Sequence, residues 1–173
     1  CGLYCYGKSG HFLLPEVAAV QVGSFKASKL ADFVPVMIGV IRSWGGDRFR
    51  IHDVGDFYSA GYLQKWIDIM RGCPQVKFYA YTKNLPLILR YHDQGLLPSN
   101  FKFIQSEGGK FDHLIRRDLP VARIFKDRES LKRAKFSDAT ESDLAASKGN
   151  KRIGLIPHGA GRFRLEKKLN GSV

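Results

Sequence analysis

The sequence predicts an α/β protein in which repeated βα units form a mostly parallel sheet or a partial (β/α) barrel. Short runs rich in β-branched and aromatic residues recur between residues 48 and 156, and helical segments separate the first of them. Strands that alternate with helices of this length are joined by crossovers, which make the strands parallel. A length of 173 residues is enough for one hydrophobic core. We therefore expect a single domain at residues 1–161 and a basic tail at residues 162–173.

The individual elements follow from periodicity and from local start and stop signals. Pro35 lies inside the first helical segment and either starts a helix afresh or kinks it, because proline lacks an N–H donor. Ser59 is a candidate N-cap for the second helix, and Pro86 fits the first turn of the third. Residues 137–150 are polar and form a loop or an exposed helix. The expected helices are residues 29–44, 62–70 and 85–92, and the expected strands are residues 48–54, 76–81, 101–105, 121–125 and 153–156.

Several side chains are expected to be structural. Trp44 and Trp66 lie on apolar helix faces and should be core residues. Tyr79 and Tyr81 share one face of a strand and should pack against a helix. Cys73, at the end of a helix, is also interpreted as structural.

Every loop that follows a strand should lie at one edge of such a sheet, because the strands run parallel. This edge is where α/β proteins usually bind ligands. All five loops carry polar residues or glycines, which are also ordinary turn residues. The residues in question are Asp53, Gly55, Asp56, Thr82, Lys83, Ser106, Glu107, Gly108, Lys126, Asp127, His158, Gly159 and Gly161.

The net charge of +12, from 28 basic and 16 acidic residues, is concentrated towards the C-terminus. Residues 121–173 hold 13 Lys or Arg residues against 6 Asp or Glu residues. Such a surface attracts polyanions, with nucleic acid as the first candidate, unless it is simply a solvated basic face. The residues that we expect to contact nucleic acid are Lys132, Arg133, Lys135, Lys151 and Arg152.

The composition is that of a soluble, reduced protein. No apolar run approaches the ~20 residues needed to span a bilayer, so no membrane partner is expected. Three cysteines are too few for a secreted disulfide framework, which favours an intracellular location.

Cys1 and Cys5 are spaced so that two thiolates could reach one metal ion or iron–sulfur cluster. Two ligands complete neither a zinc site nor a cubane cluster, so a further ligand is needed. Radical S-adenosylmethionine enzymes use the spacing C-x3-C-x2-C, and the third position here is Lys8. The missing ligand is then an upstream cysteine or His11; the alternative is that the two cysteines are neighbours by chance.

Residues 2–9 also match G-x4-G-K-[ST], the spacing of a phosphate-binding loop. Such a loop needs a helix immediately after it, and Gly10 and Pro15 are helix breakers. The bulky Tyr4 and Tyr6 would also crowd the backbone N–H groups that hold phosphates. A nucleotide hydrolase is therefore disfavoured.

Four segments are informative together: residues 50–59, 62–66, 73–74 and 77–83. These segments resemble the gene-product-88-like family of phages and plasmids, and Cys5-Tyr6-Gly7 is similar to that family's Cys-Tyr-Ala element. The resemblance covers most of residues 1–110 and implies a further cysteine upstream of Cys1. It also implies a phage accessory protein that acts in the cytoplasm of the host cell.

The family's layout is similar to that of radical S-adenosylmethionine proteins. This similarity implies an iron–sulfur cluster on Cys1 and Cys5 that would reductively cleave S-adenosylmethionine. Asp56 is positioned like the acidic residue that holds the amino group of that cofactor by a charge-assisted hydrogen bond. The residues implied to bind the cofactor are Gly55, Asp56, Ser106 and Glu107.

Two functional hypotheses follow from the sequence. The first is a metal- or cluster-containing accessory protein with radical chemistry on an unknown substrate. The second is a non-catalytic protein that binds nucleic acid or a host protein through the basic residues of the range 121–173.

Overall fold

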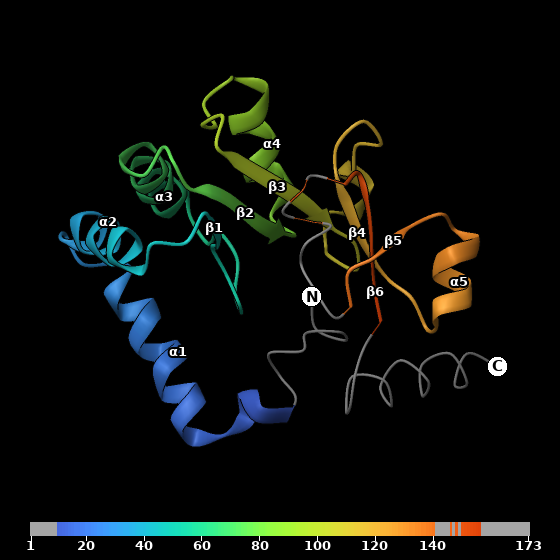
Figure 1. The fold of residues 1–173 in the computed structure, drawn as a ribbon, viewed down its shortest axis with the longest axis horizontal. Helices are drawn as coiled ribbons and strands as arrows, with labels where there is room; N and C mark the ends of the chain where they lie inside the picture. The colour runs from blue at the N-terminus through green and yellow to red at the C-terminus, as the bar shows by residue number, and fades with distance from the viewer. Residues whose placement is uncertain (1–9, 141–145, 147, 149, 157–173) are drawn as a thin grey trace.

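The computed structural model describes residues 10–140, 146, 148 and 150–156. Its centre is a parallel sheet of six strands in the order β1-β2-β3-β4-β6-β5, curled into a half-barrel (Figure 1). The expected α/β class and parallel sheet are therefore confirmed. The strands are β1 (Arg48–Arg50), β2 (Lys77–Thr82), β3 (Phe101–Ser106), β4 (Val121–Ile124), β5 (Ser137–Asp138) and β6 (Arg152–Leu155).

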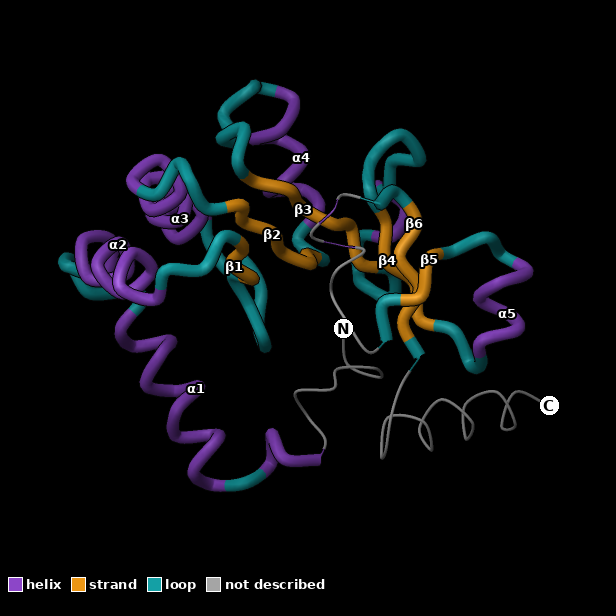
Figure 2. The backbone as a smooth tube through the Cα atoms, in the orientation of Figure 1, coloured by secondary structure: helices purple, strands orange, loops and turns teal. Residues whose placement is uncertain are grey.

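Helices join the strands in the first half of the sheet. The helix α3 joins β1 to β2, and α4 joins β2 to β3. The connection from β3 to β4 is mostly loop with one short 3-10 turn (Figure 2). None of the described helices is long and apolar enough to cross a bilayer. The helices are η2 (Gly10–Leu13), α1 (Pro15–Ala27), α2 (Phe33–Trp44), α3 (Ala60–Gly72), α4 (Leu85–Asp93), η3 (Asp112–Leu114) and α5 (Arg128–Arg133).

Local sequence explains where these helices begin. Ser59 is the N-cap of α3, because its hydroxyl oxygen accepts a hydrogen bond of 3.1 Å from the backbone N–H of Tyr62. Pro35 lies in the first turn of α2, where a backbone N–H has no partner within the helix. The helix therefore starts close to Pro35, without a kink to accommodate it. Asp127 caps α5 by accepting a hydrogen bond of 2.7 Å from the N–H of Ser130.

The two faces of the sheet have different neighbours. Side chains alternate along each strand, so Phe78 and Ala80 of β2 are buried in the main core with side chains from α2, α3 and α4. The opposite face, called here the inner face, carries Tyr79 and Tyr81, which pack against a smaller cluster around Ile104. In Figure 1, α2, α3 and α4 lie beside β1–β3, and α1 points away from them. No residue of α1 is buried.

Three sequence-based expectations need correction. The first strand ends at Arg50, because the following residues form the loop that Asp56 fastens to β2. Trp44 is 57% exposed, because α2 ends beside it and its ring lies over the glycine turn at residues 45–46. The polar segment after residue 136 begins with a strand, β5.

Candidate functional site

The carboxylate of Asp56 fastens the loop after β1 to the end of β2. Its Oδ1 accepts hydrogen bonds from the backbone N–H of Phe57 (2.7 Å) and from Oγ1 of Thr82 (2.6 Å). Its Oδ2 accepts hydrogen bonds from the backbone N–H groups of Lys83 (2.7 Å) and Asn84 (3.2 Å). A carboxylate has about four acceptor positions, so those of Asp56 are all used within the chain. In this arrangement Asp56 is a clamp between two strand-end loops.

The environment of Asp56 acts on its ionisation in two directions. Burial raises the pKa of the carboxyl above its usual range, and the hydrogen bonds from Thr82 and from the backbone of Lys83 oppose this change. The neighbouring Gly55 is exposed and has a φ of +103°, a conformation that favours glycine. The cofactor roles expected for Gly55 and Asp56 stay predictions.

Glu107 and Ser106 reach the same edge from the end of β3. The guanidinium of Arg123 binds the Glu107 carboxylate with two hydrogen bonds, Nε to Oε2 at 2.5 Å and Nη2 to Oε1 at 2.8 Å. The Nζ of Lys83 donates to the backbone carbonyl of Glu107. The sequence placed Lys83 and Glu107 at one edge, and the structure brings them into contact. Their partner Arg123 was missed, because it lies within a strand and in no motif.

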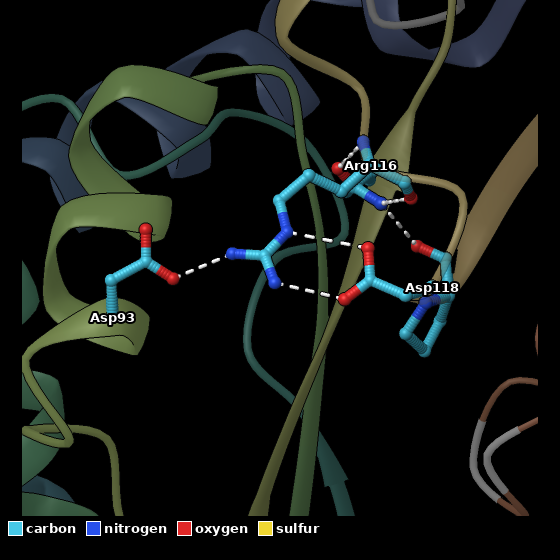
Figure 3. A network of polar contacts seen from close by, with 5 residues as sticks. Asp93, Arg116 and Asp118 are labelled. Carbon is cyan, nitrogen blue, oxygen red and sulfur yellow. Dashed lines mark hydrogen bonds and ion pairs between the residues drawn. The ribbon is translucent and has the colours of Figure 1, made fainter.

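The long connection from β3 to β4 is held by a buried amide. The side chain of Gln105 is fully buried, and its Oε1 accepts a hydrogen bond of 2.8 Å from the backbone N–H of Arg116. Its Nε2 donates to the carbonyls of Arg116 (2.8 Å) and Pro120 (3.3 Å). The Arg116 guanidinium then lies between Asp93 (2.6 Å) and Asp118 (2.8 Å), as Figure 3 shows. These contacts fix the loop that leads into β4.

His52 lies among aromatic rings at the end of β1. Its ring centroid is 4.8 Å from that of Phe57 and 5.8 Å from that of Tyr62. Nε2 is 3.3 Å from the hydroxyl of Tyr62, and Nδ1 has no hydrogen-bond partner among the described residues. Burial, with a smaller contribution from Arg50, lowers the pKa of His52 from 6.5 to about 4. The imidazole is therefore neutral at pH 7.

The five cations expected to contact nucleic acid lie where the strands begin, at the opposite edge of the sheet. The last turn of α5 is followed, after three residues, by β5, and β5 pairs in parallel with β6. Ser137 is the register partner of Ile153, so the residues just before each strand are neighbours. Arg152 lies with its guanidinium 4.6 Å from the ring centroid of Phe136. The basic edge, as we call it, consists of the exposed residues Lys132, Arg133, Lys135, Lys151 and Arg152.

Ion pairing differs between the two edges of the sheet. Near the ends of the strands, Arg123 pairs with Glu107, and Arg128 pairs with Asp138 at 3.3 Å. The five side chains of the basic edge form no ion pair with a carboxylate of the described residues. Asp127 interacts electrostatically with Arg133 without forming an ion pair, and the cations of the basic edge can contact external phosphates.

The expected metal ligands Cys1 and Cys5 lie outside the described residues. Among residues 10–140 and the described positions after them, no group of three or more His, Cys, Asp or Glu side chains could hold a metal ion. Cys73 is fully buried and is a free thiol. Its burial agrees with the structural role that the sequence suggested.

The resemblance to phage proteins is borne out by comparison with known families. A family model described as Gene product 88 matches residues 1–168. The chain belongs to the gene product 88 family. It is similar to the Gene 88 protein of Mycobacterium phage L5, with 42% identity over 107 residues, which cover 56% of this chain and 45% of the phage protein. This gene product 88 chain therefore matches somewhat less than half the length of that relative. No solved structure matches the chain.

Proposed function

We propose that this gene product 88 family protein binds nucleic acid through the basic edge. The observation that carries the proposal is the gathering of five exposed cations on one edge, without ion pairs to described carboxylates. When exposed Lys and Arg side chains contact phosphates, they release the cations condensed on the nucleic acid. This release supplies a large share of the affinity for nucleic acid. The net charge of +12 adds long-range attraction for the same ligand.

A structural explanation covers only part of this cluster. Lys132 and Arg133 lie in the last turn of α5, where cations interact favourably with the carbonyl end of the helix. Lys135, Lys151 and Arg152 lie outside any described helix. The interaction with the end of α5 does not explain why these three cations lie beside Lys132 and Arg133. Their gathering supports an anionic partner shared by all five.

The test compares two variants that lose the same charge. The first replaces all five basic-edge residues with glutamine. The second replaces five exposed cations elsewhere with glutamine: Lys26, Arg90, Lys110, Lys126 and Arg128. In fluorescence anisotropy with a labelled oligonucleotide, the basic-edge variant should lose about tenfold or more in affinity, whereas the control should stay within about twofold. Equal losses would mean that only net charge matters, and the proposal would fail.

A second candidate function is supported by the half-barrel itself. An all-parallel curled sheet directs the loops after its strands to one edge, and Ser106 and Glu107 lie there with Gly55 and Asp56. Because Asp56 already accepts four hydrogen bonds, an amino group of S-adenosylmethionine would bind through Glu107 or Ser106. Cys1 and Cys5 would hold the iron–sulfur cluster, which supplies the electron for cleavage of the cofactor.

Metal analysis tests this second candidate. The protein should be purified without oxygen, and iron, sulfide and zinc should be measured per chain. Near-stoichiometric iron with matching sulfide, lost when Cys1 and Cys5 are both replaced with serine, supports the cluster. Zinc alone would make the cysteines a structural site, and a protein without any metal would contradict the candidate.

A further inference from the structure

A pocket of about 430 Å³ opens at the beginning of β1, β2 and β3. Four cations from four separate segments line it. They are Arg48 of β1, Lys77 of β2, Lys102 of β3 and Lys148, which precedes β6, and together they define the basic pocket. No aspartate or glutamate is among the lining residues. The pocket is distinct from the basic edge, and the five-residue variant described above leaves it unchanged.

Strand pairing places two of these cationic residues side by side. Arg48 and Lys77 are register partners in a parallel pair, so both side chains leave the inner face from strands about 4.8 Å apart. Like charges in directly opposed positions are unfavourable. A carboxylate of Asp47 lies 3.5 Å from Arg48, but its side chain is 79% exposed, and such exposed pairs contribute little. An anion in the pocket would interact favourably with both charges.

The walls of the pocket also contain an aromatic ring. Tyr79 lines the pocket and is the register partner of Lys102, so ring and cation leave neighbouring strands on the same face. A ring beside cations is the arrangement by which proteins bind single strands, since the base stacks while the phosphate meets the charge. In a duplex the bases are already stacked on each other and are less accessible to a ring in the wall of a pocket.

One residue of the basic pocket lies close in sequence to the basic edge. The Nζ of Lys102 donates a hydrogen bond of 3.4 Å to the backbone carbonyl of Lys148. Lys148 is three residues before Lys151, the first basic-edge residue of that segment. The pocket and the basic edge therefore approach each other in sequence, at Lys148 and Lys151.

We infer that the basic pocket binds a phosphate and its nucleotide from a single nucleic-acid strand, whose neighbouring phosphates lie on the basic edge. This inference rests on the proposed nucleic-acid function and adds the class of substrate, a single strand in place of a duplex. A free nucleotide carries the same phosphate chemistry, and the experiment separates the two sources.

The experiment again uses two variants with equal change in charge. K77E/K102E reverses two exposed lysines of the pocket, and K110E/K126E reverses two exposed lysines in loops that follow β3 and β4. The probes are a fluorescent oligothymidylate of about 15 nucleotides, the corresponding duplex, and thymidine triphosphate. Thermal unfolding of each variant checks that the fold is kept.

The expected result is a loss of about tenfold or more in single-strand affinity for K77E/K102E and about twofold or less for K110E/K126E. The loss for the duplex should be smaller than for the single strand. Unchanged single-strand affinity in K77E/K102E would overturn the inference. If the five-residue basic-edge variant nevertheless loses affinity as expected, the proposed function would survive. Loss of triphosphate binding alone would assign the pocket to a free nucleotide and also overturn it. No oligonucleotide binding by the unmodified protein would overturn both.

Discussion

Thr82 donates a hydrogen bond of 2.6 Å from its hydroxyl to Oδ1 of Asp56, which lies 26 residues earlier in the chain. Thr82 is only 1% exposed, so this bond is shielded from water. It joins the loop after β1 to the last residue of β2 and thereby sets the geometry of two neighbouring loops at one edge of the sheet. The stability of that edge should therefore depend on Asp56.

Replacing Asp56 with asparagine should lower the free energy of unfolding by about 2–3 kcal/mol. The amide keeps the shape of the side chain, but its NH2 group is a donor. It cannot accept the hydrogen bonds that backbone N–H groups donate to one of the two carboxylate oxygens. Chemical denaturation measures the change. The matched control is Asp32→Asn, an exposed aspartate that makes no capping hydrogen bond, which should change stability by less than about 0.5 kcal/mol. If both variants lost the same amount, Asp56 would not be a clamp.

The buried His52 should make stability depend on pH. Its pKa in the folded protein is about 4 against 6.5 for the free side chain, so the unfolded chain binds more protons between these values. Stability should then fall as the pH drops from 6.5 to about 4, by about 3 kcal/mol from this group. His52→Gln should remove that part of the pH dependence, whereas replacement of the exposed His113 should retain it. If the free energy of unfolding changed with pH in the same way for the unmodified protein and for His52→Gln, the prediction would be contradicted.

Gln105 should be essential for the order of the β3–β4 connection. Leucine at this position fills a similar volume but leaves the N–H of Arg116 without its partner, at a cost of about 2 kcal/mol. The carbonyl of Pro120 keeps its hydrogen bond from the backbone N–H of residue 105 and loses only the one from the side chain. Hydrogen exchange should also become faster in residues 107–120. Gln94→Leu, at an exposed position, is the control and should leave both measurements unchanged. Normal protection of the loop in Gln105→Leu would show that other contacts order it.

The parts of the fold that could be predicted are those encoded locally. The N-cap Ser59 and the apolar spacing of α3 lie within one short segment, and both appear as expected. The strand β5 has only two residues, Ser137 and Asp138, with no apolar alternation, and it exists because it pairs with β6. Trp44 was misplaced because apolar periodicity does not tell how much of a helix end its neighbours will cover.

The site could be predicted only as a set of positions. Parallel topology placed Asp56, Lys83 and Glu107 at one edge, but their contacts join residues 24–28 positions apart and cannot be found from spacing. The cations of the basic pocket were not predicted, because ligand sites of parallel sheets are expected at the ends of the strands and these residues stand at the beginnings. Their signal was present, since Arg48 and Lys77 each stand first in a strand of the same parallel sheet.

The most direct test of the central claim is the salt dependence of oligonucleotide binding by the unmodified protein. If the five basic-edge residues each contact a phosphate of a single strand, the logarithm of affinity should fall against the logarithm of salt concentration with a slope of about −3.5. The slope should become markedly shallower when those five residues are replaced with glutamine. A slope near zero, or an identical slope in that variant, would contradict nucleic-acid binding through the basic edge.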